Sequence, residues 1–268
     1  MSRLQQTFQR LRETNRKALI PYVTAGDPSP QISVPLMHAM VAAGSDMIEL
    51  GVPFSDPMAD GPTIQRASER ALKHHVGLRD VLAMVQEFRQ QDHQTPIVLM
   101  GYLNPIEVMG YEAFASGAAE AGVDGVLIVD MPPEETGLLT DHLKNNAIDM
   151  IFLIAPNSTE QRIRKIVSFA SGYLYYVSLK GVTGAGHLDL DSVAQKLDQI
   201  RSLTDLPIGV GFGVKNADMA RAIGSLADGV VVGSALIEQI ESSLDSSEKA
   251  IQAVEQLLKS MREGLDFS

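Results

Sequence analysis

The apolar residues of this chain fall into two kinds of stretch, which alternate along almost its whole length. One kind is a short continuous run rich in Val, Ile and Leu, as expected of a strand covered on both faces. In the other kind, apolar residues recur every three or four positions, as expected of an amphipathic helix. The runs predict strands at 18–28, where the run leads into a turn, 47–50, 97–102, 126–129, 150–155, 173–178, 208–213 and 230–233.

Helical spacing predicts helices between these strands. They lie at 31–43, 63–74, 78–91, in a region ending at 120, at 134–146, 159–170, 190–200 and 216–223, and after 234. One short pattern, a small residue or Gly followed by Asp, precedes three of the strands, at 43–46, 121–124 and 226–228. Strands that alternate with helices form a parallel sheet, and eight such units in about 250 residues are the size of a (β/α)8 barrel.

A doubly wound sheet is the main alternative to the barrel. It would more often carry a G-x-G-x-x-G fingerprint after the first strand, and positions 24–28 lack one. No linker divides the chain, so we expect an α/β protein with a single (β/α)8 TIM-barrel domain over 1–268. Leu4, Phe8 and Leu11 predict an extra N-terminal helix packed on the fold. A transit peptide is the alternative, which Glu13 and the scarcity of serine disfavour.

Composition narrows the possible functions. The 268 residues are 45% hydrophobic and carry a net charge of −11, which argues against nucleic acid or an anionic membrane as a partner. There is no cysteine, so disulfides and thiolate chemistry are absent, and a cytoplasmic location is expected. The histidines show no metal-binding spacing, so we infer no metal site.

The predicted strand at 47–50 contains a carboxylate, Glu49, where an apolar residue would be expected. Because side chains alternate along a strand, Met47 and Glu49 face one way, and Ile48 and Leu50 face the other. A carboxylate that points into a packed interior is costly unless it has a partner or a task. Glu49 is therefore a candidate catalytic residue, with a buried acid bonded to a backbone amide as the alternative.

The loop after this strand is rich in Pro and Gly, which define its path. It contains Asp56 and Asp60, and Pro62 then predicts the first turn of a helix. Asp60 is thus held close in sequence to the strand acid and is the second candidate of a catalytic pair. The alternative is that both aspartates are turn residues or helix caps.

The active site of a barrel lies at the carboxyl ends of its strands. Residues at these ends are Tyr22, Glu49, Met100, Tyr102, Asp130 and Tyr175, with the loop 179–188 and glycine turns at 209–213 and 233–234. The two glycine turns follow the last two strands and precede helices, which is typical of a phosphate site. The alternative is a pair of tight turns, with Ser234 as a plain helix cap.

The glycine-rich loop 181–187 suits a lid that excludes water, or is mobile without a function. Lys180 precedes it and suggests a Schiff base with a ketone substrate, although a solvated lysine is favoured at that place. Tyr175 either faces the site or packs in the core.

The stretches 49–57 and 59–65 closely resemble the signature of the tryptophan synthase alpha chain family. The stretches 21–28, 181–184, 211–213 and 233–235 are similar to that family too, in the expected order, so the resemblance covers nearly the whole chain. It implies a (β/α)8 barrel that cleaves indole-3-glycerol phosphate to indole and glyceraldehyde 3-phosphate, a retro-aldol step without a cofactor.

The resemblance also implies roles for individual residues. Glu49 would be the acid–base group, Asp60 would stabilise the indole N–H, and Tyr175 would assist near Glu49. The substrate-binding residues would be Tyr22, Met100 and Phe212 around the indole, Thr183 in the lid, and Gly184, Gly213, Gly233 and Ser234 at the phosphate. We expect Glu49 to have a raised pKa because it faces the interior, and Asp60 to stay ionised in a polar loop.

A partner follows from the same resemblance. The family works with a pyridoxal-phosphate beta chain in an α2β2 complex, and Asp56, Pro57, Asn104 and Pro132 match the region that would meet it. Leu179, Lys180 and Gly101 depart from the family pattern, so the resemblance does not predict loop closure or the fine shape of the pocket. Three further interpretations remain open: a Schiff-base aldolase that uses Lys180, a binding subunit without chemistry, and a paralogue that releases free indole.

Overall fold

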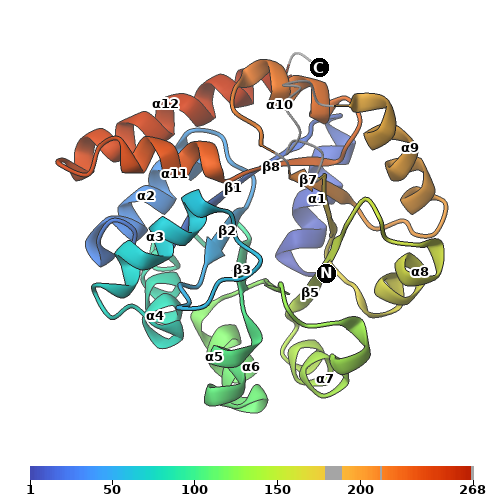
Figure 1. Ribbon diagram of the computed structural model, residues 1–268, viewed down its shortest axis with the longest axis horizontal. Coiled ribbons are helices and arrows are strands. Elements are labelled where there is room, and N and C mark those ends of the chain that lie inside the picture. Colours follow the sequence, from blue (N-terminus) through green and yellow to red (C-terminus); the bar gives the residue numbers. More distant parts are fainter. Residues whose placement is uncertain (179–188, 212, 267–268) are drawn as a thin grey trace.

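The predicted strands form a closed parallel barrel. The computed structural model describes residues 1–178, 189–211 and 213–266. In this part of the chain, neighbouring strands pair in sequence order, and β1 also pairs with β8 to close the barrel (Figure 1). The strands are β1 (Ala18–Thr24), β2 (Ile48–Gly51), β3 (Ile97–Gly101), β4 (Gly125–Ile128), β5 (Asp149–Ile154), β6 (Leu174–Val177), β7 (Ile208–Gly211) and β8 (Gly229–Val232). The (β/α)8 fold is therefore confirmed, and the alternative of a doubly wound sheet is excluded.

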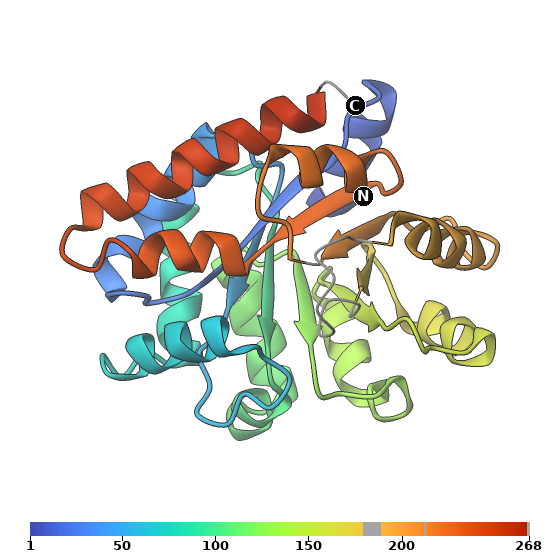
Figure 2. The same ribbon diagram turned by 45° about the horizontal axis from the view of Figure 1, so that its top comes forward.

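One helix of an outer ring follows each strand. These helices are α2 (Pro30–Ala42), α4 (Leu78–Phe88), α6 (Tyr111–Ala121), α7 (Gly137–Asn145), α8 (Glu160–Phe169), α9 (Leu190–Arg201), α10 (Ala217–Gly224) and α12 (Ser247–Asp266). Additional short elements are α1 (Arg3–Glu13), α3 (Pro62–Leu72), α5 (Leu103–Met109), η1 (Pro133–Glu135) and α11 (Ser234–Glu241). The long helix α12 runs along the outside of the barrel beside α11 (Figure 2). No helix among the described residues has the length and apolar character needed to cross a membrane.

Three of the predicted helices are each divided into two in the structure. The region ending at 120 is two helices, because Gly110 has φ +89° and separates α5 from α6. The predicted helix 134–146 is η1 followed by α7, because the Thr136 hydroxyl donates to the Pro133 carbonyl at 3.0 Å and closes a short first turn. The helix expected after 234 is likewise two helices, α11 and α12, on either side of 242–246.

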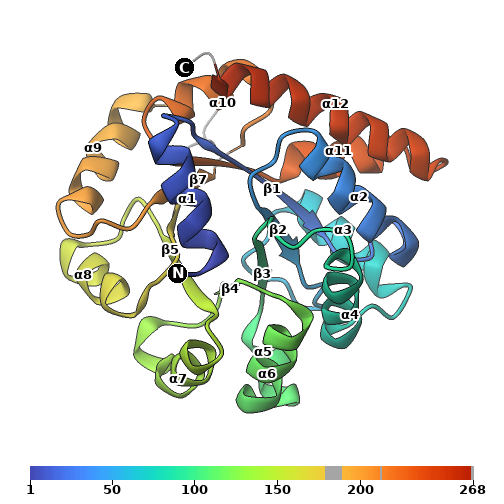
Figure 3. The ribbon, with the colours of Figure 1, turned by 180° about the vertical axis from the view of Figure 1, so that it is seen from behind.

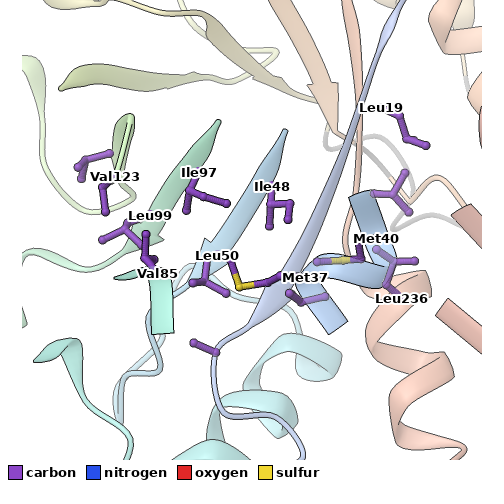
Figure 4. Packing of buried hydrophobic residues seen from close by; sticks show 14 of the residues in the cluster. Leu19, Met37, Met40, Ile48, Leu50, Val85, Ile97, Leu99, Val123 and Leu236 are labelled. Carbon is purple, nitrogen blue, oxygen red and sulfur yellow. The ribbon is translucent and has the colours of Figure 1, made fainter. Parts of the chain in front are cut away.

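Side chains of β2 divide between two cores, as the alternation predicted. Ile48 and Leu50 pack outward against helix residues such as Met37 and Met40 of α2 (Figure 4). Met47 instead belongs to the cluster that fills the barrel interior. Glu49, between Ile48 and Leu50, therefore also points inward, and no part of its surface is exposed.

Helix α1 covers the amino-terminal end of the barrel (Figure 3). Its buried face carries Leu4, Phe8 and Leu11, which belong to the interior cluster. Arg3 fastens the helix because its guanidinium donates to Asp124 at 2.8 Å. The prediction of an N-terminal helix packed on the fold is confirmed.

The repeated pattern of a small residue or Gly followed by Asp has a structural explanation. Each of the three aspartates lies before a strand and forms two hydrogen bonds with one residue of a neighbouring strand. The aspartate backbone amide donates to the backbone carbonyl of the strand residue, and the aspartate carboxylate accepts from the backbone amide of the same residue. The pairs are Asp46 with Leu19, Asp124 with Ile97 and Asp228 with Ile208, at 2.8–3.0 Å. The pattern therefore aligns neighbouring strands at the amino-terminal end of the barrel.

Candidate active site

A cavity of about 640 Å³ opens at the carboxyl ends of the strands. Five residues singled out from the sequence line it together: Asp60, Met100 and Tyr175, with Asp130 and Pro132 from the loop after β4. This is the end of a barrel at which active sites are found.

Glu49 lies fully buried in the barrel interior below this face. Its Oε1 atom accepts a hydrogen bond from the Tyr173 hydroxyl, whereas Oε2 is buried and has no hydrogen-bond partner among the described residues. Burial raises the pKa of Glu49 to about 8, and the hydrogen bond from Tyr173 partly opposes this rise. The carboxyl group therefore carries a proton at neutral pH, unlike an ordinary glutamate.

Tyr173 is a residue that the sequence analysis did not single out. It directly precedes β6 and lies two positions before Tyr175, so both rings point toward the barrel interior. The alternation of side chains along the strand was the available signal for Tyr173. The resemblance placed Tyr175 near Glu49, whereas the hydrogen bond to Glu49 comes from Tyr173.

Glycines make room for the tyrosines of the site. A Cβ atom at Gly211 of β7 would collide with the Tyr175 hydroxyl, and one at Gly51 of β2 would collide with the Tyr22 hydroxyl. Both glycines are thus required by the close approach of a ring from the neighbouring strand. Tyr22 is buried, and its hydroxyl lies 3.4 Å from Thr24 Oγ1, so the slot expected to be apolar also contains hydroxyl groups.

Asp60 lies on the loop between β2 and α3. The Tyr102 hydroxyl donates to Asp60 Oδ2 at 3.1 Å and accepts from the Ala59 amide at 3.0 Å. Gln65, in the first turns of α3, donates to the Asp60 carbonyl at 2.8 Å. The loop is held from both sides, and Phe54 stacks on the Tyr102 ring with centroids 5.1 Å apart.

Asp60 is more shielded from solvent than an ordinary loop residue. The residue is half-buried, and burial raises its pKa above the usual value, although the hydrogen bond from Tyr102 opposes that rise. The sequence analysis named Tyr102 among the residues at the ends of the strands but gave it no role, and its contacts with Asp60 and Ala59 supply one.

The glycine turns lie where the sequence placed them. Gly213 has φ +46° after β7, and Gly233 directly precedes α11, whose first residue Ser234 is exposed. A Cβ atom at Gly233 would stand 3.5 Å from the Tyr22 ring, so this turn adjoins the tyrosine of the slot. The amides at the start of α11 have the orientation that favours an anion.

Several candidate residues lie outside the described residues. They are Thr183, Gly184 and Phe212, together with Leu179 and Lys180. Their predicted roles stay predictions. In the described residues, no group of three or more His, Asp or Glu side chains is placed to hold a metal ion.

The residues expected to meet a partner lie on three neighbouring segments that follow β2, β3 and β4: the loop that carries Asp56 and Pro57, the start of α5 with Asn104, and the loop that carries Pro132. Asp56 and Asn104 are exposed, while Pro57 and Pro132 are partly exposed. The hydrogen bond from the Ala59 amide to the Tyr102 hydroxyl joins the first segment to the second. The Leu103 amide donates to Asp130 Oδ1 at 2.9 Å and joins the second segment to the third.

Fold and site together define a (β/α)8-barrel enzyme with an inward-facing acid and a second acid at the mouth. A sequence model of the family described as tryptophan synthase alpha chain matches residues 8–266. The chain belongs to this family. Its members cleave indole-3-glycerol phosphate in tryptophan biosynthesis, and the chain is accordingly a lyase.

Individual relatives agree with this assignment. The tryptophan synthase alpha chain of Methylococcus capsulatus is 63% identical over 99% of this chain and 100% of its own length. That of Thioalkalivibrio sulfidiphilus is 61% identical over the same shares. The crystal structure of tryptophan synthase subunit alpha from Legionella pneumophila superposes with a TM-score of 0.94 at 45% identity, covering 100% of both chains. A tryptophan synthase structure from M. tuberculosis has a TM-score of 0.88 at 35% identity, covering 99% of this chain and 100% of that one.

Proposed function

We propose that Glu49 moves both protons of the cleavage reaction. In its protonated form it delivers a proton to indole C3, which makes the ring a cation. The resulting carboxylate takes the proton of the glycerol hydroxyl next to the ring. The carbon–carbon electrons then return to the ring, so indole and glyceraldehyde 3-phosphate form and Glu49 is protonated again. The observation that carries the proposal is the buried carboxyl group of Glu49, whose pKa is raised to about 8.

Asp60 stabilises the positive charge that develops on the ring by accepting from the indole N–H. This role is supported by its place in the cavity wall and by the hydrogen bonds that hold its loop. Tyr102 positions the carboxylate. Tyr175 completes the wall beside the reacting carbon and assists there.

The substrate's two ends bind on opposite sides of the mouth. Tyr22 and Met100, with Phe212, surround the indole, and Gly213, Gly233 and Ser234 hold the phosphate with backbone amides and a hydroxyl. Thr183 and Gly184 complete this set on the lid. The whole stretch 1–268 acts as one barrel domain, and this chain supplies no cofactor of its own.

The partner is a tryptophan synthase beta chain, which holds pyridoxal phosphate, in an α2β2 complex. Its docking surface consists of the three joined segments that carry Asp56, Pro57, Asn104 and Pro132. Support comes from one exposed apolar side chain on each of the first two segments: Met58 of the Asp60 loop is 86% exposed, and Val108 of α5 is 82% exposed. Exposed apolar side chains are typical of an interface.

Indole release from indole-3-glycerol phosphate tests the function, with the purified chain alone and with a beta chain added. We expect slow release that rises strongly with the beta chain, and no release from the Glu49→Gln variant in either condition. The matched control is Glu160→Gln, which removes a charge from an exposed ion pair on α8 and leaves release unchanged. Full activity of Glu49→Gln would refute the acid–base role. A permanent adduct after borohydride treatment with substrate would favour the Schiff-base aldolase instead.

A further inference from the structure

Two of the additional helices, α3 and α11, lie against each other at the mouth of the barrel (Figure 1). Helix α3 begins two residues after Asp60, and α11 begins at Ser234, directly after Gly233. The helices therefore continue from the two places that, in the proposed function, bind the two ends of one substrate. Whatever sets the distance between these helices also influences the distance between those binding points.

Four charged side chains join the two helices to the loop after β1. Arg66 of α3 donates through two nitrogens to both oxygens of Glu241, the last residue of α11, at 2.6 and 2.7 Å. Arg70, one turn further along α3, donates to Glu241 at 3.0 Å. It also donates to both oxygens of Asp27, at 2.6 and 2.9 Å. We refer to Arg66, Arg70, Glu241 and Asp27 as the clamp.

The clamp has the geometry of a positioning device. A guanidinium group is planar, so a two-pronged bond to a carboxylate determines orientation as well as distance. Asp27 is fully buried and the Arg70 side chain is 13% exposed, so the inner pair is shielded from solvent. The Arg66 side chain is 47% exposed, and an exposed ion pair of this kind contributes little to folding stability.

We propose that the clamp sets the separation between the Asp60 loop and the amino end of α11, so that both ends of the substrate are held at once. Glu241 is a positioning residue in this proposal, because neither it nor the other clamp residues line the cavity. The proposal rests on the proposed function, which places the phosphate at α11. Its physical basis is that small errors in the placement of reacting groups cost large factors in rate.

The test compares the separate ends of the substrate with the joined molecule. Indole, inorganic phosphate and 3-(indol-3-yl)propyl phosphate, which has both ends but no hydroxyls to cleave, are titrated calorimetrically into wild type and Glu241→Gln. We expect Glu241→Gln to bind indole and phosphate as wild type does, but to lose about tenfold in affinity for the joined compound. Its kcat for cleavage should fall by at least the same factor.

A second variant distinguishes a specific effect of the clamp from a general loss of structure. Arg66→Lys keeps the charge but loses the two-pronged bond, so its effect on the joined compound should lie between wild type and Glu241→Gln. Glu255→Gln, which breaks an exposed ion pair with Lys259 on α12, is the matched control and should change nothing.

Two results would overturn the proposal in different ways. Equal losses for indole, phosphate and the joined compound in Glu241→Gln would show that the clamp merely supports the fold. A wild-type protein that binds the joined compound no better than its separate ends would refute the proposed binding mode itself, and the clamp proposal with it.

Discussion

Replacing Glu49 by Gln should change how the stability of the protein depends on pH. The pKa of Glu49 rises from a usual value of 4.5 to about 8 because the side chain is buried. Between these two values the folded protein holds a proton that the unfolded chain releases. The stability of wild type therefore falls as pH rises through this window, and all of the loss is present above pH 8.

The magnitude follows from the two pKa values. Each pH unit in the window corresponds to about 1.4 kcal/mol, so ionising Glu49 in the folded state costs about 5 kcal/mol in total. A glutamine at this position has a similar shape and does not ionise. The free energy of unfolding of Glu49→Gln minus that of wild type should therefore grow by about 5 kcal/mol from below pH 4.5 to above pH 8.

Urea unfolding at a series of pH values measures this difference directly. The control is Glu160→Gln on the exposed surface of α8, whose stability difference from wild type should stay nearly constant. A Glu49→Gln curve that runs parallel to wild type from pH 4.5 to 9 would refute the raised pKa. The alkaline limb of kcat/KM, which reports the free enzyme, should independently show an apparent pKa near 8, because the protonated acid is lost there.

Three further predictions follow from the site. Asp60→Asn should lower kcat by at least about 100-fold, measured as indole release at saturating substrate, and near-normal turnover would contradict its role. Tyr173→Phe removes the hydrogen bond that lowers the pKa of Glu49, so the alkaline limb of kcat/KM should move to higher pH; a limb that moves down would exclude this coupling. Gly211→Ala should reduce stability in urea by about 1–3 kcal/mol, because the added methyl group meets a tyrosine hydroxyl. Gly137→Ala, at the first position of α7, is its control and should be tolerated, since a Cβ atom there meets nothing within 4 Å; equal losses in both variants would contradict the steric explanation.

The loop that contains Asp60 shows which features a local sequence predicts and which it does not. Pro62 begins α3 as the sequence predicted, because proline suits the first turn of a helix. The burial of Asp60 and its hydrogen bond from the Tyr102 hydroxyl were not predicted, because both depend on residues from other elements. Only the folded chain brings these groups together, so a loop composition cannot indicate the direction of such a pKa shift.

The sequence by itself indicated eight alternating strands and helices, a barrel as the favoured fold, and the inward direction of Glu49. These follow from periodicity, because alternation along a strand and spacing along a helix are local properties. The candidate acids could also be identified, because a carboxylate in an apolar strand is visible without a structure.

Only the tertiary structure decided which groups act on those acids. Tyr173 bonds to Glu49 across 124 positions of the chain, and Arg66 bonds to Glu241 across 175. Such contacts depend on how the barrel closes and on which glycines leave room for a ring. Neither is encoded in a local pattern, because burial and hydrogen-bond partners are set by residues far apart in sequence.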